Sequence, residues 1–175
     1  RRERRLRVSG EPAEVAGQVP GPLVAPARIG VEELQHHPLQ VDRYAGLARS
    51  EPLVAVVHAP YLEETFTAAC GAGAYLGQRR LQVTGTATLE DALLATGFHY
   101  ERRTLAANNV RNFNNLILEV RGIRRTGSAA MDLAYVAAGR LDGFWEPHLS
   151  AWDVAAGILL VQEAGGRVTD FAGGT

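Results

Sequence analysis

The sequence predicts a layered α/β fold in which helices and strands alternate along a single chain. Its 175 residues suffice for one domain with a buried core and are few for two. Apolar and alternating segments in the middle of the chain are typical of strands, and two capped apolar segments in the last third are typical of helices. Because the two kinds of element alternate in order, an α/β or layered α+β architecture is favoured.

The first 50 residues are predicted to form a poorly defined N-terminal segment, and the core is predicted to span residues 51–175. Six of the eight prolines and eight of the 18 arginines lie before residue 53, where periodicity is weak. One short helix is expected there, beginning at Glu32 and ending before Pro38. The arginines of the first seven residues are expected to form a solvated tail.

The middle of the chain is predicted to consist mostly of strands. A continuous apolar run indicates a buried strand, and strict alternation indicates a half-buried one. In order, the expected elements are a buried strand over 53–57, a turn over 60–63, a strand over 64–68, a hairpin from 75–76 and 81–83, and a helix followed by a strand within 108–120.

The last third of the chain carries the clearest pattern, because it has start and stop signals for two helices. Ser128 is a good N-cap for the first helix and Gly139 a good C-cap, and Ser150 caps the second helix. In order, the expected elements are a helix over 128–138, a strand over 141–145, a helix over 151–164 and a closing strand over 167–171.

Composition and charge exclude several classes of function. A net charge of −1 gives no overall field that would attract nucleic acid or an anionic membrane, and no apolar run approaches the length of a membrane span. The single cysteine, Cys70, rules out an internal disulfide and a cysteine-built metal site, and it is expected to be a small buried residue. His58, His99 and His148 are expected to lie on the surface or in loops. We expect a protein of the reducing cytoplasm.

Three features near the two predicted helices each admit a structural and a functional interpretation. Asp153 is either a favourable charge in the first turn of a helix or a hard oxygen ligand for Mg²⁺. The segment Gly127–Ser128–Ala129 is either a capped turn or a set of backbone N–H groups that suits an anion or a sugar hydroxyl. Glu146 is either a solvated loop charge or an acceptor for substrate hydroxyls.

These residues lie within a longer pattern that closely resembles a known family. The pattern consists of GSAAMDLAYVAAGRLDGFWE at 127–146, WDVAAG at 152–157 and EAGGRVTD at 163–170. It resembles the C-terminal signature of the inositol monophosphatase family, the Mg²⁺-dependent, lithium-sensitive sugar phosphatases. The resemblance continues upstream and covers roughly residues 51–175.

The resemblance implies a fold of alternating helix and sheet layers and the hydrolysis of inositol or sugar phosphate monoesters with two or three Mg²⁺ ions. Asp153 matches a metal-binding aspartate of the family, and Glu146 matches a residue that binds inositol hydroxyls. Gly127, Ser128 and Ala129 match the substrate-facing start of a helix. The resemblance also implies a small-molecule phosphate as substrate, a homodimer, and neither nucleic acid nor a membrane as partner.

The sequence departs from the family pattern at the remaining metal ligands. The family motif Asp-Pro-Ile/Leu-Asp-Gly-Thr is absent, and its best counterpart, residues 25–30, has Ala25 and Arg28 in place of the aspartates. Glu11 is a candidate second metal ligand, because Gly10–Glu11–Pro12 stands where the family has Gly-Glu-Glu. Asp153 and Glu11 would bring only two negative charges to two Mg²⁺ ions, and arginine would add a positive one. No catalytic residue is therefore assigned.

Three explanations of this departure remain open. The chain is a truncated family member with a degenerate site, or residues 1 to about 50 come from a shifted reading frame, or the ligands come from elsewhere in the chain. The corresponding functions are an impaired phosphomonoester hydrolase and, as the alternative, a catalytically inactive polyol-phosphate binder or assembly subunit of the same family.

Overall fold

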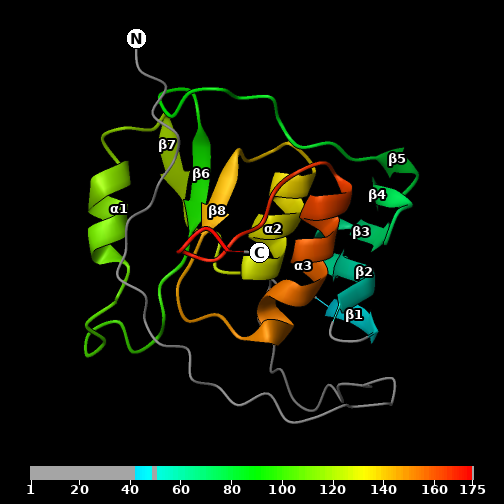
Figure 1. Cartoon of the computed structure of the whole chain (residues 1–175), viewed down its shortest axis with the longest axis horizontal. Helices are drawn as coiled ribbons and strands as arrows, with labels where there is room; N and C mark the ends of the chain where they lie inside the picture. The colour runs from blue at the N-terminus through cyan, green and yellow to red at the C-terminus, as the bar shows by residue number, and fades with distance from the viewer. Residues whose placement is uncertain (1–41, 49–50, 175) are drawn as a thin grey trace.

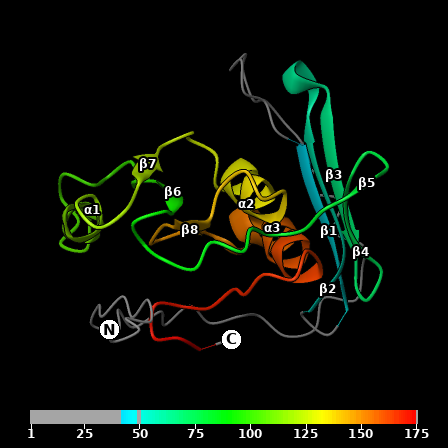
Figure 2. The same cartoon turned by 90° about the horizontal axis from the view of Figure 1, so that it is seen from above.

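The computed structural model describes residues 42–48 and 51–174 and shows four layers of secondary structure. Seen from above, a five-stranded sheet is followed by the helix pair α2 and α3, then by a three-stranded sheet, and finally by the short helix α1 (Figure 2). Alternating layers of sheet and helix confirm the predicted layered α/β fold.

The larger sheet is antiparallel throughout, with strands in the order β1-β2-β3-β4-β5. Its strands are β1 (Asp42–Ala48), β2 (Glu51–Ala59), β3 (Glu64–Ala69), β4 (Gly73–Leu76) and β5 (Arg79–Arg80), and the 3₁₀ turn η1 (Pro60–Leu62) joins β2 to β3. Side chains that alternate along β2 and β3, such as Val57 and Phe66, are fully buried against the helices. The sheet therefore supplies one wall of the core.

The helices α2 (Ala129–Ala137) and α3 (Ala151–Glu163) lie side by side and cover one face of this sheet (Figure 1). Apart from Asp132, their buried residues are apolar, and Leu160 is fully buried. The two helices approach closely at Gly157. A Cβ built on Gly157 would lie 2.5 Å from both Cβ and Cδ1 of Leu133. This contact needs glycine because Leu133 Cβ is fixed by its own helix backbone.

Replacing Gly157 with alanine is expected to destabilise the fold, although alanine is otherwise the better helix former by about 1 kcal/mol. Overpacking of a core contact typically costs about 1–3 kcal/mol, and here the helices must separate to admit the methyl group. Urea unfolding followed by circular dichroism measures the difference. Gly85→Ala is the matched control, because a Cβ on Gly85 meets nothing within 4 Å. A Gly157→Ala variant more stable than the parent would contradict this packing.

The smaller sheet is parallel, with the strand order β7-β6-β8. Its strands are β6 (Leu93–Thr96), β7 (Gly122–Arg124) and β8 (Gly143–Trp145), and α1 (Val110–Leu116) lies on the side away from α2 (Figure 1). Asp142 fixes the start of two strands, because its carboxylate accepts the backbone N–H of Leu93 at 2.6 Å. Parallel pairing brings the carboxyl ends of all three strands to one edge of the sheet.

Most of the predicted strands and helices in the described residues are present. The expected strands over 53–57 and 64–68 are confirmed and extend to the bounds of β2 and β3, and the expected turn over 60–63 contains η1. The two capped helices are confirmed as α2 and α3, and the expected strand over 141–145 is β8, which begins two residues later. β1 was not expected, and it lies before the predicted core boundary at residue 51.

Three predicted strands were wrong. Residues 167–171 form no strand, because Asp170 closes a turn by accepting the backbone N–H groups of Ala172 and Gly174. The second strand of the hairpin is β5 rather than residues 81–83, since Val83 donates its N–H to Ala164 beyond α3. The segment 108–120 contains α1 and then turns, and the next strand begins only at Gly122.

Cys70 is exposed, contrary to the expectation of a buried residue. It follows the last residue of β3 and lies in the turn to β4, where the alternation of buried and exposed positions ends. The carboxylate of Glu163 holds this turn against α3, because it accepts the backbone N–H groups of Gly71 and Gly73 at 2.8 and 2.7 Å.

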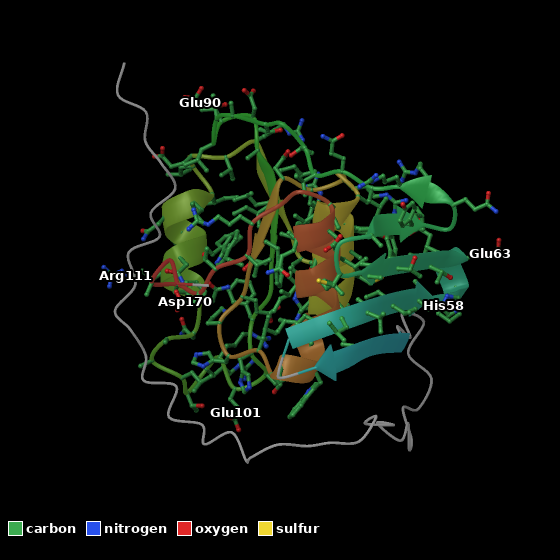
Figure 3. The ribbon with its side chains drawn as sticks, turned by 45° about the vertical axis from the view of Figure 1, so that its right-hand side comes forward. His58, Glu63, Glu90, Glu101, Arg111 and Asp170 are labelled. Atoms are coloured by element: carbon green, nitrogen blue, oxygen red, sulfur yellow. The ribbon has the colours of Figure 1, made fainter. Side chains whose placement is uncertain are left out.

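Of the three histidines in the described residues, one lies in a strand of the larger sheet and two lie in loops. His58 lies within β2 rather than in a loop and contacts the Thr65 hydroxyl at 2.8 Å. Figure 3 shows His58 and Glu63 at the end of the antiparallel sheet, far across the view from Arg111 of α1. His99 and His148 lie in loops, as expected, with their ring centroids 5.9 Å apart. The expected helix at Glu32 lies outside the described residues.

Candidate functional site

The candidate site lies at the carboxyl edge of the parallel sheet. Gly97 follows β6, the segment 125–127 follows β7, and Glu146 follows β8. α2 begins two residues after Gly127. Crevices at the carboxyl ends of parallel strands are common ligand sites, because several loops and helix starts meet there. The topology thus brings together two features that are 19 residues apart in sequence, Gly127 and Glu146.

The carboxyl group of Glu146 packs directly against the backbone of Gly97. A Cβ built on Gly97 would lie 2.1 Å from Oε2 and 2.2 Å from Oε1 of Glu146. Any side chain at this position would displace the carboxyl group. The Glu146 carboxyl group therefore occupies space that is open only because residue 97 is glycine.

A second acid, Asp132, is buried close to Glu146. Its side chain is 1% exposed, and the Thr126 hydroxyl donates a 2.8 Å hydrogen bond to its Oδ1. Burial raises the pKa of Asp132 to about 6, while the Thr126 hydrogen bond and the charge of Arg125 oppose the rise. Asp132 therefore keeps its proton to a higher pH than an exposed aspartate does.

The electrostatics of Glu146 show which charges surround it. Burial raises the pKa of Glu146, and the nearby charges of Asp132 and, more weakly, Asp153 raise it further. The guanidinium of Arg125 acts in the opposite direction. Glu146, Asp132, Asp153 and Arg125 thus lie close enough to affect one another. A ligand bound here must donate hydrogen bonds to the Glu146 carboxylate, because an ionised carboxylate only accepts them.

The start of α2 is shaped by Gly127 and Ser128. Gly127 has φ +95°, a left-handed conformation that favours glycine, and Arg125 Nη1 lies 3.0 Å from where a Cβ would stand. Ser128 occupies the N-cap position, as predicted, but its hydroxyl makes no cap hydrogen bond to the first turn. The first-turn N–H groups, which begin at Ala129, therefore receive no acceptor from their N-cap side chain.

Asp153 serves a structural role at the start of α3. Its Oδ2 accepts the backbone N–H of Ser150 at 3.2 Å, and the two residues form a capping box. Trp152 beside it is 64% exposed. Asp153 therefore has a helix-start function in this structure, and its influence on Glu146 places it near the same acidic group.

Mg²⁺, which the family resemblance implies, does not fit the described part of the chain on its own. In residues 42–48 and 51–174, no group of three or more histidine, cysteine, aspartate or glutamate side chains is arranged to hold a metal ion. Asp153 accepts the Ser150 N–H through Oδ2 in the capping box of α3. Glu11, the second predicted metal ligand, lies outside the described residues.

A cavity of about 430 Å³ is lined by the first residue of β6, by the segment 124–126 and by part of α2 and the turn after it, and it is rich in arginine. Its lining residues are Leu93, Arg124, Arg125, Thr126, Tyr135, Arg140 and Leu141. Arg140 is committed to Glu64 through two hydrogen bonds and stacks over Tyr135 at 4.8 Å. The cavity touches the candidate site only through Arg125 and Thr126, because Gly127 and Glu146 do not line it.

Three residues of the site were not predicted from the sequence. Asp132 is the single acid within an otherwise apolar predicted helix, and such a pattern could have indicated a buried polar group. Gly97 directly follows β6, and a glycine at the end of a buried strand can mark a place where another group packs against the backbone. Asn109 is buried with φ +69°, and it was missed because it stands in an asparagine-rich segment.

Comparison with known proteins assigns the family. The model of the inositol monophosphatase family matches residues 45–175. An inositol-1-monophosphatase of Mesorhizobium japonicum is 49% identical over 129 residues, which are 73% of this chain and 48% of that protein. The Nus factor SuhB of Pseudomonas aeruginosa is 54% identical over 121 residues, covering 68% of this chain and 45% of that protein.

A solved structure agrees with the sequence relatives. The inositol monophosphatase of Anabaena (Nostoc) sp. superposes with a TM-score of 0.76 at 43% identity, covering 78% of this chain and 57% of that one. The chain belongs to the inositol monophosphatase family, and it spans about half the length of the curated relatives it matches. Within the described residues, no helix is both long and apolar enough to cross a membrane.

Proposed function

We propose that this chain takes part in the hydrolysis of inositol or sugar phosphate monoesters and that its described residues supply the recognition of the polyol. The observation that carries the proposal is the Glu146 carboxyl group seated on Gly97, beside the start of α2. The names of the inositol-1-monophosphatase relatives support the same reaction. The substrate is a small-molecule phosphate.

Polyol recognition follows from the hydrogen-bonding chemistry of these groups. An ionised Glu146 carboxylate accepts hydrogen bonds from neighbouring hydroxyls, and it has two oxygens with which to do so. The first-turn N–H groups of α2, from Ala129 onward, favour an anionic or hydroxyl oxygen. Because hydroxyl donors stabilise the charged form of an acid, polyol binding should lower the pKa of Glu146, which burial raises.

Turnover by the 175-residue chain is expected to be impaired. Hydrolysis in this family is implied to depend on Mg²⁺, and the described residues offer no group of three metal-ligating side chains. Ala25 and Arg28 replace carboxylates in the segment that best matches the missing motif. The same observations favour the second candidate, a polyol-phosphate binder without turnover or an assembly subunit.

Two substitutions discriminate these functions. We expect Glu146→Gln to weaken binding of myo-inositol 1-phosphate by about tenfold or more, because one charge-assisted acceptor is lost. Asp153→Asn should leave binding in EDTA nearly unchanged, since the proposed polyol contact is made by Glu146 and the start of α2 rather than by Asp153. Isothermal titration calorimetry measures both affinities, and phosphate release with Mg²⁺ measures turnover.

The control for Glu146→Gln is Glu90→Gln, an exposed residue that Figure 3 shows at the edge of the molecule. Glu90 precedes β6, at the opposite end of that strand from Gly97. Equal affinities of the parent and Glu146→Gln would contradict polyol recognition at this site. Phosphate release that both Glu146→Gln and Asp153→Asn abolish would establish an active hydrolase and remove the second candidate.

We also propose that the chain works as a homodimer in the cytoplasm. Family membership is what supports this assembly. Light scattering after gel filtration measures the mass directly. A monomeric mass at micromolar concentration would contradict the homodimer.

A further inference from the structure

A buried amide, Asn109, connects the two strands that end at the candidate site. Its side chain is 3% exposed and its backbone has φ +69°. It immediately precedes α1, and neither the predicted site nor the proposed polyol contact uses it. A buried polar group with an uncommon backbone conformation calls for a physical reason.

The amide uses its full hydrogen-bonding capacity. Nδ2 donates to Thr96 Oγ1 at 2.8 Å and to the carbonyl oxygen of Gly97 at 2.7 Å. Oδ1 accepts from Trp145 Nε1 at 2.8 Å and from Asn112 Nδ2 at 3.3 Å. A carboxylate could not make the first two bonds, and an aliphatic side chain could make none. Asparagine also tolerates the left-handed backbone better than most residues.

The hydrogen bonds close a ring across the sheet. The Thr96 hydroxyl, which accepts from Asn109, itself donates to the carbonyl oxygen of Trp145 at 2.7 Å. Trp145 in turn donates its indole N–H back to Asn109. Thr96 is fully buried and Asn109 is 3% exposed, so water has little access to the hydrogen bond between them. The ends of β6 and β8 are therefore tied together by side chains beyond their backbone pairing.

We propose that Asn109 is a positioning residue for Glu146, because its amide fixes both Trp145, which precedes Glu146, and Gly97, on which the Glu146 carboxyl group rests. This inference rests on the proposed function, since it gives the polyol contact its geometry. Asn109 does not itself touch the proposed ligand. Loss of the amide frees the Gly97 carbonyl and the Trp145 indole together, and the Glu146 carboxyl group then moves toward solvent.

The first test uses Asn109→Gly, which keeps the left-handed backbone available and removes the amide. Two readouts are needed: the ¹⁵N–¹H signal of the Trp145 indole and the titration of the ¹³C-labelled Glu146 carboxyl group. The chain has two tryptophans, so Trp152→Phe assigns the indole signal. We expect the indole signal to move upfield and the pKa of Glu146 to fall toward its ordinary value, because the carboxyl group becomes solvated.

The second readout is affinity for myo-inositol 1-phosphate in EDTA. We expect Asn109→Gly to weaken binding by about fivefold to tenfold, because the Glu146 carboxylate is still present but is displaced from its position. Asn109→Asp should do the same, because it keeps the size of the side chain and removes both donors. Asn114→Asp is the control, with the same charge change on the exposed face of α1. Thermal unfolding verifies that each variant is folded.

The outcomes separate this inference from the proposed function. If the parent binds no polyol phosphate, the proposed function fails, while the titration of Glu146 still decides the positioning role. A Glu146 titration that is identical in the parent and in folded Asn109→Gly would overturn the inference. Normal polyol affinity in both Asn109 variants would overturn it as well. Should Asn109→Asp not fold, the neutral Asn109→Gly variant carries the test.

Discussion

Replacing Gly97 with alanine is expected to weaken polyol-phosphate binding by about tenfold or more while leaving the chain folded. A methyl group on Gly97 would lie 2.1 Å from Glu146 Oε2, far closer than atoms can approach. The obstacle is the end of a flexible side chain, so the carboxyl group can swing aside at small cost in stability. Glu146 would then stand away from the start of α2. We expect an affinity loss of about tenfold or more, comparable to removal of its charge.

Calorimetric titration with myo-inositol 1-phosphate measures this effect, and thermal unfolding tests the expected stability. Gly85→Ala is again the control, because a Cβ on Gly85 meets no atom within 4 Å. The double variant Gly97→Ala with Glu146→Gln should bind no more weakly than either single variant, since both act on one carboxyl group. Additive losses would show that Gly97 acts through something other than Glu146.

Replacing Asp132 with asparagine is expected to stabilise the fold above pH 6 and to leave its stability at pH 4 unchanged. Burial raises the pKa of Asp132 from 3.8 to about 6, so the folded state keeps a proton that the unfolded state has lost. The stability of the parent therefore falls as the pH rises from about 4 to about 6. Asparagine stays neutral and can still accept the Thr126 hydroxyl through its carbonyl oxygen.

The expected gain at pH 7 is about 2–3 kcal/mol, from the linkage between a pKa shift and free energy. Denaturant unfolding at a series of pH values measures it, and the difference between variant and parent isolates Asp132 from other groups. The same change at Asp91, an exposed residue that accepts the Thr88 hydroxyl, is the control. A stability difference that does not vary between pH 4 and pH 7 would contradict the raised pKa of Asp132.

The helices α2 and α3 could be predicted because residues at their own ends determine where they begin and end. The helices α2 and α3 follow the N-cap residues Ser128 and Ser150 and end near glycines, and the sequence carries those signals directly. The prediction of a closing strand at 167–171 was wrong, because apolar alternation does not show whether a neighbouring strand is available for pairing. Asp170 instead closes a turn on residues that follow it, and no described strand pairs with the segment.

The candidate site could be predicted only in part, because its remaining residues depend on distant contacts. Glu146 and Gly127 were named from a contiguous pattern, and the parallel sheet places both at one edge. Asn109 could not be found in this way, since three of its four hydrogen-bond partners lie 12 to 36 residues away in sequence. The role of Gly97 likewise depends on where another side chain comes to rest.

The central proposal is that the described residues carry a polyol-binding group and, among themselves, no group of three metal-ligating side chains. The most direct measurement is a titration of Mn²⁺, which shares the oxygen preference of Mg²⁺, into the purified chain, followed by electron spin resonance. Asp153→Asn is titrated alongside, and circular dichroism verifies the fold. We expect no tight Mn²⁺ binding by either protein, because the described residues hold no group of three ligands. Tight binding that Asp153→Asn abolishes would contradict the account and show that a working metal site includes Asp153.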